Sequence, residues 1–581
     1  MKKQERKEQI LLLTVVGVAI LIFSVLYFKN QIPKEKVIVE VNVTEENPWT
    51  LENSVMNNQP LEEDKSIYPD EPDVSIHDVY ISVFPTKDEN GEIIDFSAFG
   101  KHQARDHSYN PVLNCNIQIL DENEMLDPLV SLDTKNATIR VRGNSSRGDV
   151  MKSYRIKLDE EAGTFNGQDS LNLNKHVEDM SKVTTKFCTD LLTDVEHMIS
   201  YQTNFMRVWI RDTSKSKEEQ EFEYYGLFTH TEQPNKSFLE KRGLSTECSM
   251  YKARDFSFNL DSRLKNVDDL SYLEEEFESV LGIREGNDHT KLLEMLQAIN
   301  DENQDFETVF NKYFNEENYL TWLAFSLLVG ADDILNHNYI LYSPNASSTW
   351  YFFPWDFDSN MVFGEKASSS LVPSIKGGQK LNQSILHRRY FRVPGNLEKI
   401  QNKMEYLMEN YFTEANIERL VQAYIPVMER TLFQMPDIGL LRISPEKLIP
   451  YTKAFYEGIQ ENYQNFLYAF QFPTPMFVSM PMRNTDGTLN LSWDTSYSYQ
   501  GRPITYNVTI ANDYNMKQVL FKQEGIIDNR LDAQIDLSPG TYYLLVTAVD
   551  SEGNEQVSME HYEFAGKEFI YKSGVLEFTI E

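Results

Sequence analysis

The segment from Ala331 to Met361 constrains this chain most, because acidic and amide side chains flank an apolar, aromatic run with the pattern of a β-hairpin. The polar side chains on the two sides of that run are Asp332, Asp333, Asn338, Asp356 and Asp358. Asp333 and Asn338 stand five positions apart, and Asp356 follows Pro354-Trp355 at the end of the second predicted strand.

These residue types suit a reaction that depends on positioning and on charge neutralisation. Mg²⁺ prefers oxygen ligands such as those of Asn338 and Asp356. A further carboxylate that orients a hydroxyl completes the minimum set for phosphoryl transfer from ATP. The alternative is turn chemistry, because Asp and Asn side chains also bond the nearby backbone in tight turns.

A second segment, Ala137–Leu158, has the pattern of a glycine-bearing hairpin. A strand over Ala137–Val141 leads into a turn at Arg142–Ser146, and a second strand returns over Lys152–Leu158. Backbone N–H groups at such a tip can hold phosphate oxygens. Lys152 shares the apolar face of the returning strand, which predicts that it points inward. An ordinary hairpin turn is the alternative here.

Together with further segments in the same order, these motifs resemble the CotH kinase family of atypical protein kinases. The resemblance covers roughly Val74 to Phe470. The segments that carry it are RGNSSR at Arg142–Arg147, KSYRIKL at Lys152–Leu158, YYGLFTHTEQPNKSFLEKR at Tyr224–Arg242, SMYKA at Ser249–Ala253, HNYILY at His337–Tyr342, WYFFPWDFD at Trp350–Asp358 and LHRRYFRVPG at Leu386–Gly395.

The resemblance implies an α+β, kinase-like two-lobe fold that binds ATP and Mg²⁺ or Mn²⁺ and phosphorylates Ser or Thr of a protein substrate. Asp333 matches the catalytic aspartate, and Asp332 is its alternative. Asn338 and Asp356 match the metal ligands.

Nucleotide-binding positions follow from the same resemblance. Lys152 matches the phosphate-anchoring lysine, with Lys157 as its rival. The other positions are Arg142, Asn144 and Ser145 in the turn, and Glu232 where a strand leaves the small lobe at a hinge that touches the adenine. An amphipathic helix over Ser181–Ile199 is expected to support the lysine, with Asp190 and Asp194 of that helix in solvent.

The N-terminal region predicts a membrane anchor. Ile10–Phe28 is 19 residues without a charge, long enough to cross a bilayer as a helix. The flanking Lys and Arg residues predict that residues 1–9 are cytoplasmic and that the body of this single-pass protein is extracytoplasmic. Residues 29–73 then form an acidic linker, in which Glu40–Asp73 has the composition of a tether.

Charge and cysteine content exclude some classes of function. The 581 residues carry a formal net charge of −34, which argues against nucleic-acid binding because phosphate backbones attract Lys and Arg. An acidic surface suits a basic, Ser-rich protein substrate, and it equally suits a solvated surface with no partner. The three cysteines do not indicate a disulfide framework or a metal site.

The second half of the chain predicts two kinds of structure. Apolar residues at three- and four-residue steps predict helices over 270–281, 290–299, 305–314, 317–329, 396–412, 415–433 and 445–467. From 473 to 581 the pattern alternates between apolar and polar residues and resembles a fibronectin type III domain, an all-β sandwich with Trp493 and Tyr506 in its core.

The sequence therefore predicts one transmembrane helix, a CotH-like kinase domain over residues 74–470 and a C-terminal β-sandwich. The expected activity is transfer of the ATP γ-phosphate to a spore coat or cell-surface protein. The alternative is a non-catalytic surface adhesin or coat-assembly scaffold on the same fold.

Overall fold

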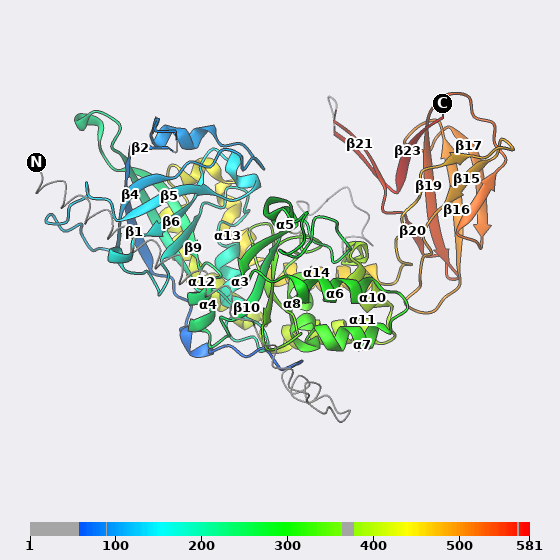
Figure 1. Ribbon diagram of the computed structural model, residues 1–581, viewed down its shortest axis with the longest axis horizontal. Helices are drawn as coiled ribbons and strands as arrows, with labels where there is room; N and C mark the ends of the chain where they lie inside the picture. Colours follow the sequence, from blue (N-terminus) through cyan, green and yellow to red (C-terminus); the bar gives the residue numbers. More distant parts are fainter. Residues whose placement is uncertain (1–56, 89, 332, 363–376, 566–568, 581) are drawn as a thin grey trace, which may run out of the picture. The chain divides into compact units, whose positions relative to one another are not determined.

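The structure, a computed structural model, describes residues 57–88, 90–331, 333–362, 377–565 and 569–580. Along the chain it consists of a seven-stranded barrel, a region in which helices surround a four-stranded sheet, and an all-β domain (Figure 1). This order matches the predicted sequence of a β-rich lobe, a helical lobe and a C-terminal sandwich.

The barrel closes in the strand order β1-β4-β5-β6-β7-β9-β8, with β1 and β8 parallel. Apolar side chains alternate into its interior, as Ala137, Ile139 and Val141 do on β5. The outer face is polar and carries Arg140 and Arg142 on the same strand. The strand bounds are β1 (Ile76–Phe84), β4 (Leu113–Leu120), β5 (Ala137–Arg142), β6 (Ser153–Leu158), β7 (Ser170–Asn174), β8 (Thr203–Asp212) and β9 (Glu223–Thr231). A short hairpin of β2 (Thr86–Lys87) and β3 (Ile93–Ile94) follows β1.

The second lobe is built around the sheet β11-β10-β12-β13. Its strands are β10 (Cys248–Ala253), β11 (Leu281–Glu285), β12 (Tyr339–Pro344) and β13 (Tyr351–Pro354). Helix α8 packs against β13, and its Trp322 ring stacks on Phe352 at 4.4 Å between centroids. The fully buried Trp322, Tyr319 and His387 extend this aromatic core.

Most of the predicted helices are present. Their bounds are α3 (Thr184–Leu192), α4 (Lys236–Lys241), α5 (Glu274–Val280), α6 (Thr290–Asn300), α7 (Phe306–Tyr313), α8 (Glu316–Leu328), α10 (Ile385–Arg392), α11 (Asn396–Asn410), α12 (Glu414–Thr431), α13 (Pro445–Lys453) and α14 (Phe455–Ala469). Two differ from expectation. The helix predicted over Ser181–Ile199 is only α3, and the one predicted over 445–467 is divided at Ala454 into α13 and α14.

Residues 57–73, which composition assigned to a tether, are an ordered segment that lies against the second lobe and the end of the barrel. Lys65 Nζ donates to the carbonyl of Met198 at 2.9 Å, and the Tyr68 hydroxyl donates to the carbonyl of Ser200 at 2.7 Å. At the other end of the segment, the Tyr351 hydroxyl donates to the carbonyl of Gln59 at 2.9 Å. Polar composition was misleading here because these polar groups bond to the folded domain.

One fully buried guanidinium joins this segment to the barrel. Arg242, which follows α4, has no exposed surface, and its Nη2 lies 2.5 Å from Glu232 Oε2. Its Nε lies 3.2 Å from Glu63 Oε2, and its guanidinium stacks over the Phe238 ring at 3.6 Å. Arg242 therefore links two buried carboxylates from distant parts of the chain, and Lys65, at 2.8 Å from Glu63, adds a second cation to this cluster.

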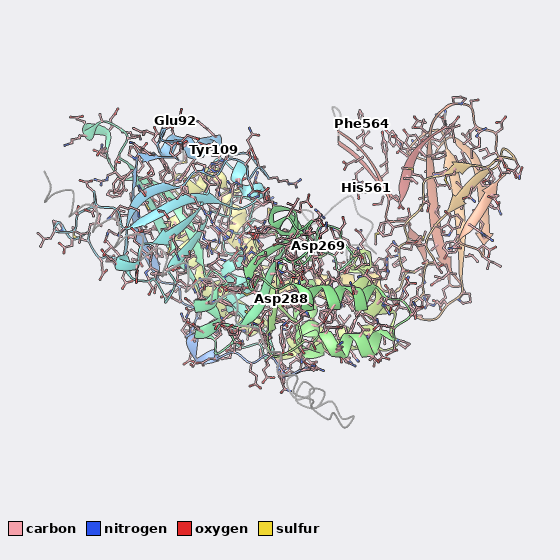
Figure 2. All side chains as sticks on the ribbon, viewed as in Figure 1. Glu92, Tyr109, Asp269, Asp288, His561 and Phe564 are labelled. Atoms are coloured by element: carbon pink, nitrogen blue, oxygen red, sulfur yellow. The ribbon has the colours of Figure 1, made fainter. Side chains whose placement is uncertain are left out.

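The C-terminal domain is a sandwich of two sheets, with strand orders β14-β15-β18 and β17-β16-β19-β20, and β23 paired to β19. Trp493 and Tyr506 meet in its core at 5.3 Å between ring centroids, as predicted. Beside the sandwich, a hairpin of β21 and β22 exposes Phe564 (Figure 2). The bounds are β14 (Met482–Arg483), β15 (Leu489–Ser492), β16 (Ile504–Ala511), β17 (Val519–Ile526), β18 (Arg530–Ala533), β19 (Gly540–Asp550), β20 (Glu555–Val557), β21 (His561–Ala565), β22 (Phe569–Ser573) and β23 (Val575–Ile580).

The prediction of a single-pass membrane protein is corrected. Within the described ranges, no helix combines the length and the apolar character needed to cross a bilayer. The longest of them, α12, has 18 residues and carries charges such as Glu418 and Arg419 along its length. The more apolar α8 has 13 residues and so spans only about 20 Å. The predicted span Ile10–Phe28 lies outside the described residues.

We expect Arg242→Met to destabilise the protein by about 3–5 kcal/mol, because the fully buried Glu232 would lose its cation at 2.5 Å and keep only the more distant Lys241. Denaturant unfolding measures this change. The control is Lys135→Met, which removes a half-exposed ion pair to Asp159 and should change the free energy of unfolding by less than about 1 kcal/mol. Equal effects of the two substitutions would contradict the central role of Arg242.

We also expect stability to fall as the pH drops below about 6.5. Burial lowers the pKa of His387 to about 3, and burial with neighbouring cations does the same for His230. Because the unfolded chain then binds protons that the folded chain excludes, each histidine costs up to about 1.4 kcal/mol per pH unit between those two pKa values.

Denaturant unfolding at pH 7.5 and 5.5 tests this expectation in a range where most carboxylates stay ionised. His387→Asn should be less stable at pH 7.5 and should lose less stability on acidification. An unchanged pH slope would show that His387 is not the source.

Candidate functional site

The hairpin of β12 and β13 brings the two predicted metal ligands to one end. Tyr339 pairs with Pro354, and one step beyond that pair the Trp355 N–H donates to the carbonyl of Asn338 at 3.1 Å. Asn338 and Asp356 therefore leave the same end of the hairpin. Both have left-handed backbone conformations, with φ of 63° and 64°, which non-glycine residues adopt at a cost and mostly at special sites.

Asp356 and Asp358 form an electrostatically coupled pair. The Asp356 side chain has exposed surface, but the protein around it still removes part of its hydration. This desolvation, and then the negative charge of Asp358, raise the pKa of Asp356. Burial also acts to raise the pKa of Asp358. There the hydrogen bond from His176, at 3.4 Å between Nδ1 and Oδ2, and nearby cations outweigh burial, so the pKa is lowered.

Cations from both lobes face this acidic pair. Arg142, at the end of β5, comes from the outer face of the barrel, and Lys252 comes from β10. Burial, together with the charges of Arg284, Arg142 and Arg254, lowers the pKa of Lys252 to about 8 in spite of Asp356. In the described part of the chain, no carboxylate lies within 4.0 Å of the cationic groups of Arg142, Lys252 or Arg284. Positive charge without an ion pair is therefore concentrated here in a chain of net charge −34.

Asp333 belongs to the same electrostatic cluster, because its charge acts on Asp358. Its side chain is about half exposed, and its Oδ2 lies 3.6 Å from His337 Nε2. The interaction with His337 lowers the pKa of Asp333, so that this group is an ionised acceptor at neutral pH. Its alternative, Asp332, lies outside the described residues.

Lys152 is placed elsewhere. Its side chain is buried, its Nζ donates to the carbonyl of Arg147 at 2.7 Å, and its charged neighbours are Asp149 and Arg147. The face of β6 that was predicted to point inward lines the interior of the barrel. The cation that acts on Asp356, Arg142, lies on the outer face of the barrel instead. The rival, Lys157, is exposed and forms an ion pair with Asp169.

The Arg142–Ser146 turn is only partly as expected. Gly143 has φ of 101°, and a Cβ there would lie 2.0 Å from Ser146 Oγ, so this position requires glycine. Asn144 and Ser145 are exposed, and Asn144 Oδ1 lies 3.1 Å from His107 Nε2. The turn therefore brings Arg142 to the acidic pair, while no contact places Asn144 or Ser145 there.

Of two expectations about acidic residues, one stays a prediction and one was wrong. The carboxylate of Glu232 is fully buried and bound by Arg242. Contact of its hinge segment with the adenine stays a prediction. Asp190 was expected in solvent, but its carboxylate is buried between Lys186 Nζ at 2.6 Å and the Tyr424 hydroxyl at 2.7 Å. Burial raises the pKa of Asp190.

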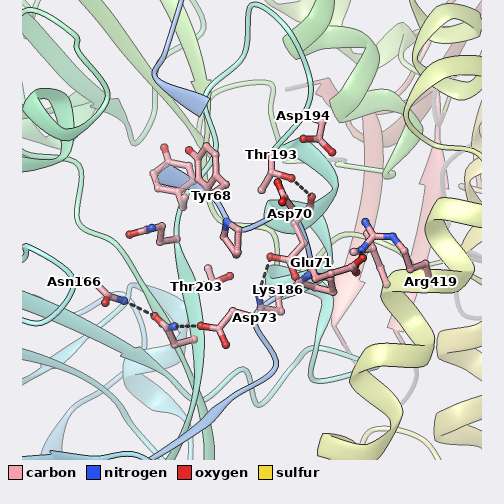
Figure 3. A pocket seen from close by; sticks show the side chains of 17 residues that line it. Tyr68, Asp70, Glu71, Asp73, Asn166, Lys186, Thr193, Asp194, Thr203 and Arg419 are labelled. Carbon is pink, nitrogen blue, oxygen red and sulfur yellow. Dashed lines mark hydrogen bonds and ion pairs between the residues drawn. The ribbon is translucent and has the colours of Figure 1, made fainter. Parts of the chain in front are cut away.

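A small recess of about 80 Å³ lies beside α3 (Figure 3). Its walls come from the Tyr68–Asp73 segment, from α3 and from the start of β8, and Arg419 reaches it from α12. None of the predicted site residues lines it. The recess and the Asp356 cluster are different places on the protein.

The donor set at the hairpin end fits Mg²⁺. Asn338, Asp356 and Asp358 offer amide and carboxylate oxygens, the ligands that this ion prefers. In the residues that the structure describes, no three His, Cys, Asp or Glu side chains converge as a metal cluster. Mg²⁺ commonly takes only one or two protein carboxylates and completes its coordination with water and substrate phosphates.

Sequence reasoning did not select Lys252, Arg284 or His176. Lys252 lies within the SMYKA motif at Ser249–Ala253, which was a visible signal. Arg284 and His176 had no signal of their own, because they reach the site only through the pairing of β11 with β10 and through the loop after β7.

A family model for CotH kinase proteins matches residues 139–466, more than half of the chain. The chain belongs to the CotH kinase family. It is 25% identical over 324 residues to the inner spore coat protein H of Bacillus subtilis (strain 168), an alignment that covers 54% of this chain and 84% of that protein. The matched range contains both the Arg142 turn and the hairpin end with Asn338 and Asp356.

A solved structure with a low overall likeness is the complex of the toxin–antitoxin proteins HipA and HipB of Shewanella oneidensis MR-1 with operator DNA. Its TM-score is 0.23 at 12% identity, with 52% of this chain and 58% of that chain covered.

The left-handed backbone at Asn338 predicts an unusual order of stability. Because Gly adopts this conformation without strain, Asn338→Gly should be more stable than Asn338→Ala by about 1 kcal/mol. Asn336, whose φ is not positive, provides the matched control, where Ala should be better than Gly. Denaturant unfolding of the four variants measures both orders, and the same order at the two positions would contradict this geometry.

Proposed function

We propose that this CotH family member is a spore coat protein with protein kinase activity, transferring the γ-phosphate of ATP to Ser or Thr of a protein substrate. The observation that carries the proposal is the Asp356–Asp358 pair at the hairpin end, flanked by Asn338 and faced by Arg142 and Lys252. Oxygen ligands next to cations without ion pairs suit a metal–polyphosphate ligand.

Each residue of the site has its own proposed role. Asn338 and Asp356 would hold Mg²⁺, which neutralises phosphate charge when bound. Asp333, ionised and partly exposed, accepts a hydrogen bond from the acceptor hydroxyl and orients it. As the bond from the hydroxyl oxygen to the γ-phosphorus forms and the bond to the ADP oxygen breaks, the hydroxyl proton passes to this carboxylate. Arg142 compensates the negative charge of the transferred group.

The proposed substrate is a basic, Ser-rich protein. The net charge of −34 favours encounter with a positively charged partner. Such a partner would meet the acidic surface of the chain, while its Ser hydroxyl reaches Asp333. The name of the Bacillus subtilis relative supports a coat protein as the partner class.

A labelled-ATP transfer assay on the full chain, with Mg²⁺ and a basic Ser-rich acceptor, tests this proposal. We expect Asp333→Ala to keep Mg²⁺-dependent nucleotide binding and to lower transfer by about 100- to 10,000-fold. Asp356→Ala should lose that binding. The control Asp169→Ala, on the exposed surface of the barrel, should do neither.

Equal loss of binding in the Asp333 and Asp356 variants would contradict this division of roles. An absence of transfer, together with no nucleotide-induced rise in melting temperature, would favour the alternative of a binding scaffold without turnover.

A further inference from the structure

Lys252 differs from the buried lysines of the two lobes. Each of those is hydrogen-bonded or paired within about 3 Å: Lys152 to Arg147 O at 2.7 Å, Lys175 to Asp437 at 2.7 Å, Lys182 to Val177 O at 2.6 Å and Lys186 to Asp190 at 2.6 Å. The half-buried Lys291 likewise donates to Pro344 O at 2.8 Å. In the described part of the chain, Lys252 has no hydrogen bond, and its nearest partner is the Trp355 ring at 5.4 Å.

The surroundings of Lys252 make its charge unfavourable in the protein alone. Asp356 after β13 attracts it, but Arg284 on β11, Arg142 on β5 and Arg254 after β10 repel it. Arg284 itself has a buried Nε without a hydrogen-bond partner in the described chain. A cation that is desolvated, repelled and unbonded costs stability unless a ligand supplies the missing negative charge.

The placement of these cations indicates the kind of ligand. Arg142 and Lys252 come from different lobes and both act on Asp356 at the hairpin end, and Arg284 lies near both of these cations. A single carboxylate ligand would leave most of this positive charge uncompensated. A polyphosphate chain carries several negative oxygens in a row and can meet cations from both sides.

We propose that Lys252, with Arg142 and Arg284, is the anchor for the polyphosphate chain of the nucleotide, in place of the barrel residue Lys152; this inference rests on the proposed kinase function. The ammonium of Lys152 is already bonded to Arg147 O, whereas Lys252 is among the largest charges that act on Asp356. Phosphate recognition then depends on the second lobe as well as on the glycine-bearing turn.

The test compares Lys252→Met with Lys152→Met in the full chain, because Met removes the charge and keeps most of the side-chain volume. Mg²⁺·ATP and inorganic tripolyphosphate are titrated by calorimetry, and melting temperatures are measured without ligand. We expect Lys252→Met to bind both probes about 10- to 100-fold more weakly. Without ligand it should melt at the same or a higher temperature, because an unbonded charge is gone.

Lys152→Met should show the opposite pattern, with a lower melting temperature and binding within about threefold of the unmutated chain. Lys252→Arg should retain most of the binding, because it keeps the charge. A purely structural role of Lys252 would lower the melting temperature of Lys252→Met and leave binding intact, which would overturn the inference.

The two probes separate this inference from the proposed function. If the unmutated chain binds tripolyphosphate but not ATP, and Lys252→Met loses that binding, the role of Lys252 as a phosphate anchor is supported and the proposed kinase function is contradicted. Binding of ATP that is equal in the unmutated chain and in Lys252→Met would leave the kinase standing and overturn the anchor. Binding of neither probe by the unmutated chain would overturn both.

Discussion

Closure of the seven strands into a barrel decides where the candidate site lies. The apolar side chains of β5 and β6 fill the interior of the barrel, so only the outer, polar face of these strands is left to meet the second lobe. Arg142 lies on that outer face and reaches Asp356 and Asp358. In an open sheet the apolar face would instead have packed on the other lobe, and Lys152 would have been near the site.

The candidate site is rich in cations, whereas the chain as a whole is strongly negative. A protein of net charge −34 concentrates arginines and a lysine around two carboxylates and leaves several of these cations without ion pairs in the described residues. Such an arrangement is costly in the free protein and becomes favourable when an anion and a divalent cation bind together. The left-handed conformations of Asn338 and Asp356 add backbone strain at the same point, a combination that is typical of functional sites.

The ordered segment at residues 57–73 shows how composition can mislead. Its many polar residues suggested a solvated tether, but Glu63 is 1% exposed and is bound by Arg242. Arg242 holds this segment and Glu232 together. The ionic contact is between residues far apart in the chain, which local composition does not report.

The sequence by itself determined the family, the order of the lobes, most helices and the β-sandwich core around Trp493 and Tyr506, because these follow from motifs and from apolar periodicity within short windows. It also placed Asn338 and Asp356 together, since a hairpin relates them locally. Only the tertiary structure decided that Lys252 and His176 join them, that Arg284 lies near Lys252, and that the side chains of Lys152 and Glu232 are bonded within the protein. Those outcomes depend on barrel closure, on the pairing of β11 with β10 and on buried ion pairs between distant segments, none of which has a local pattern.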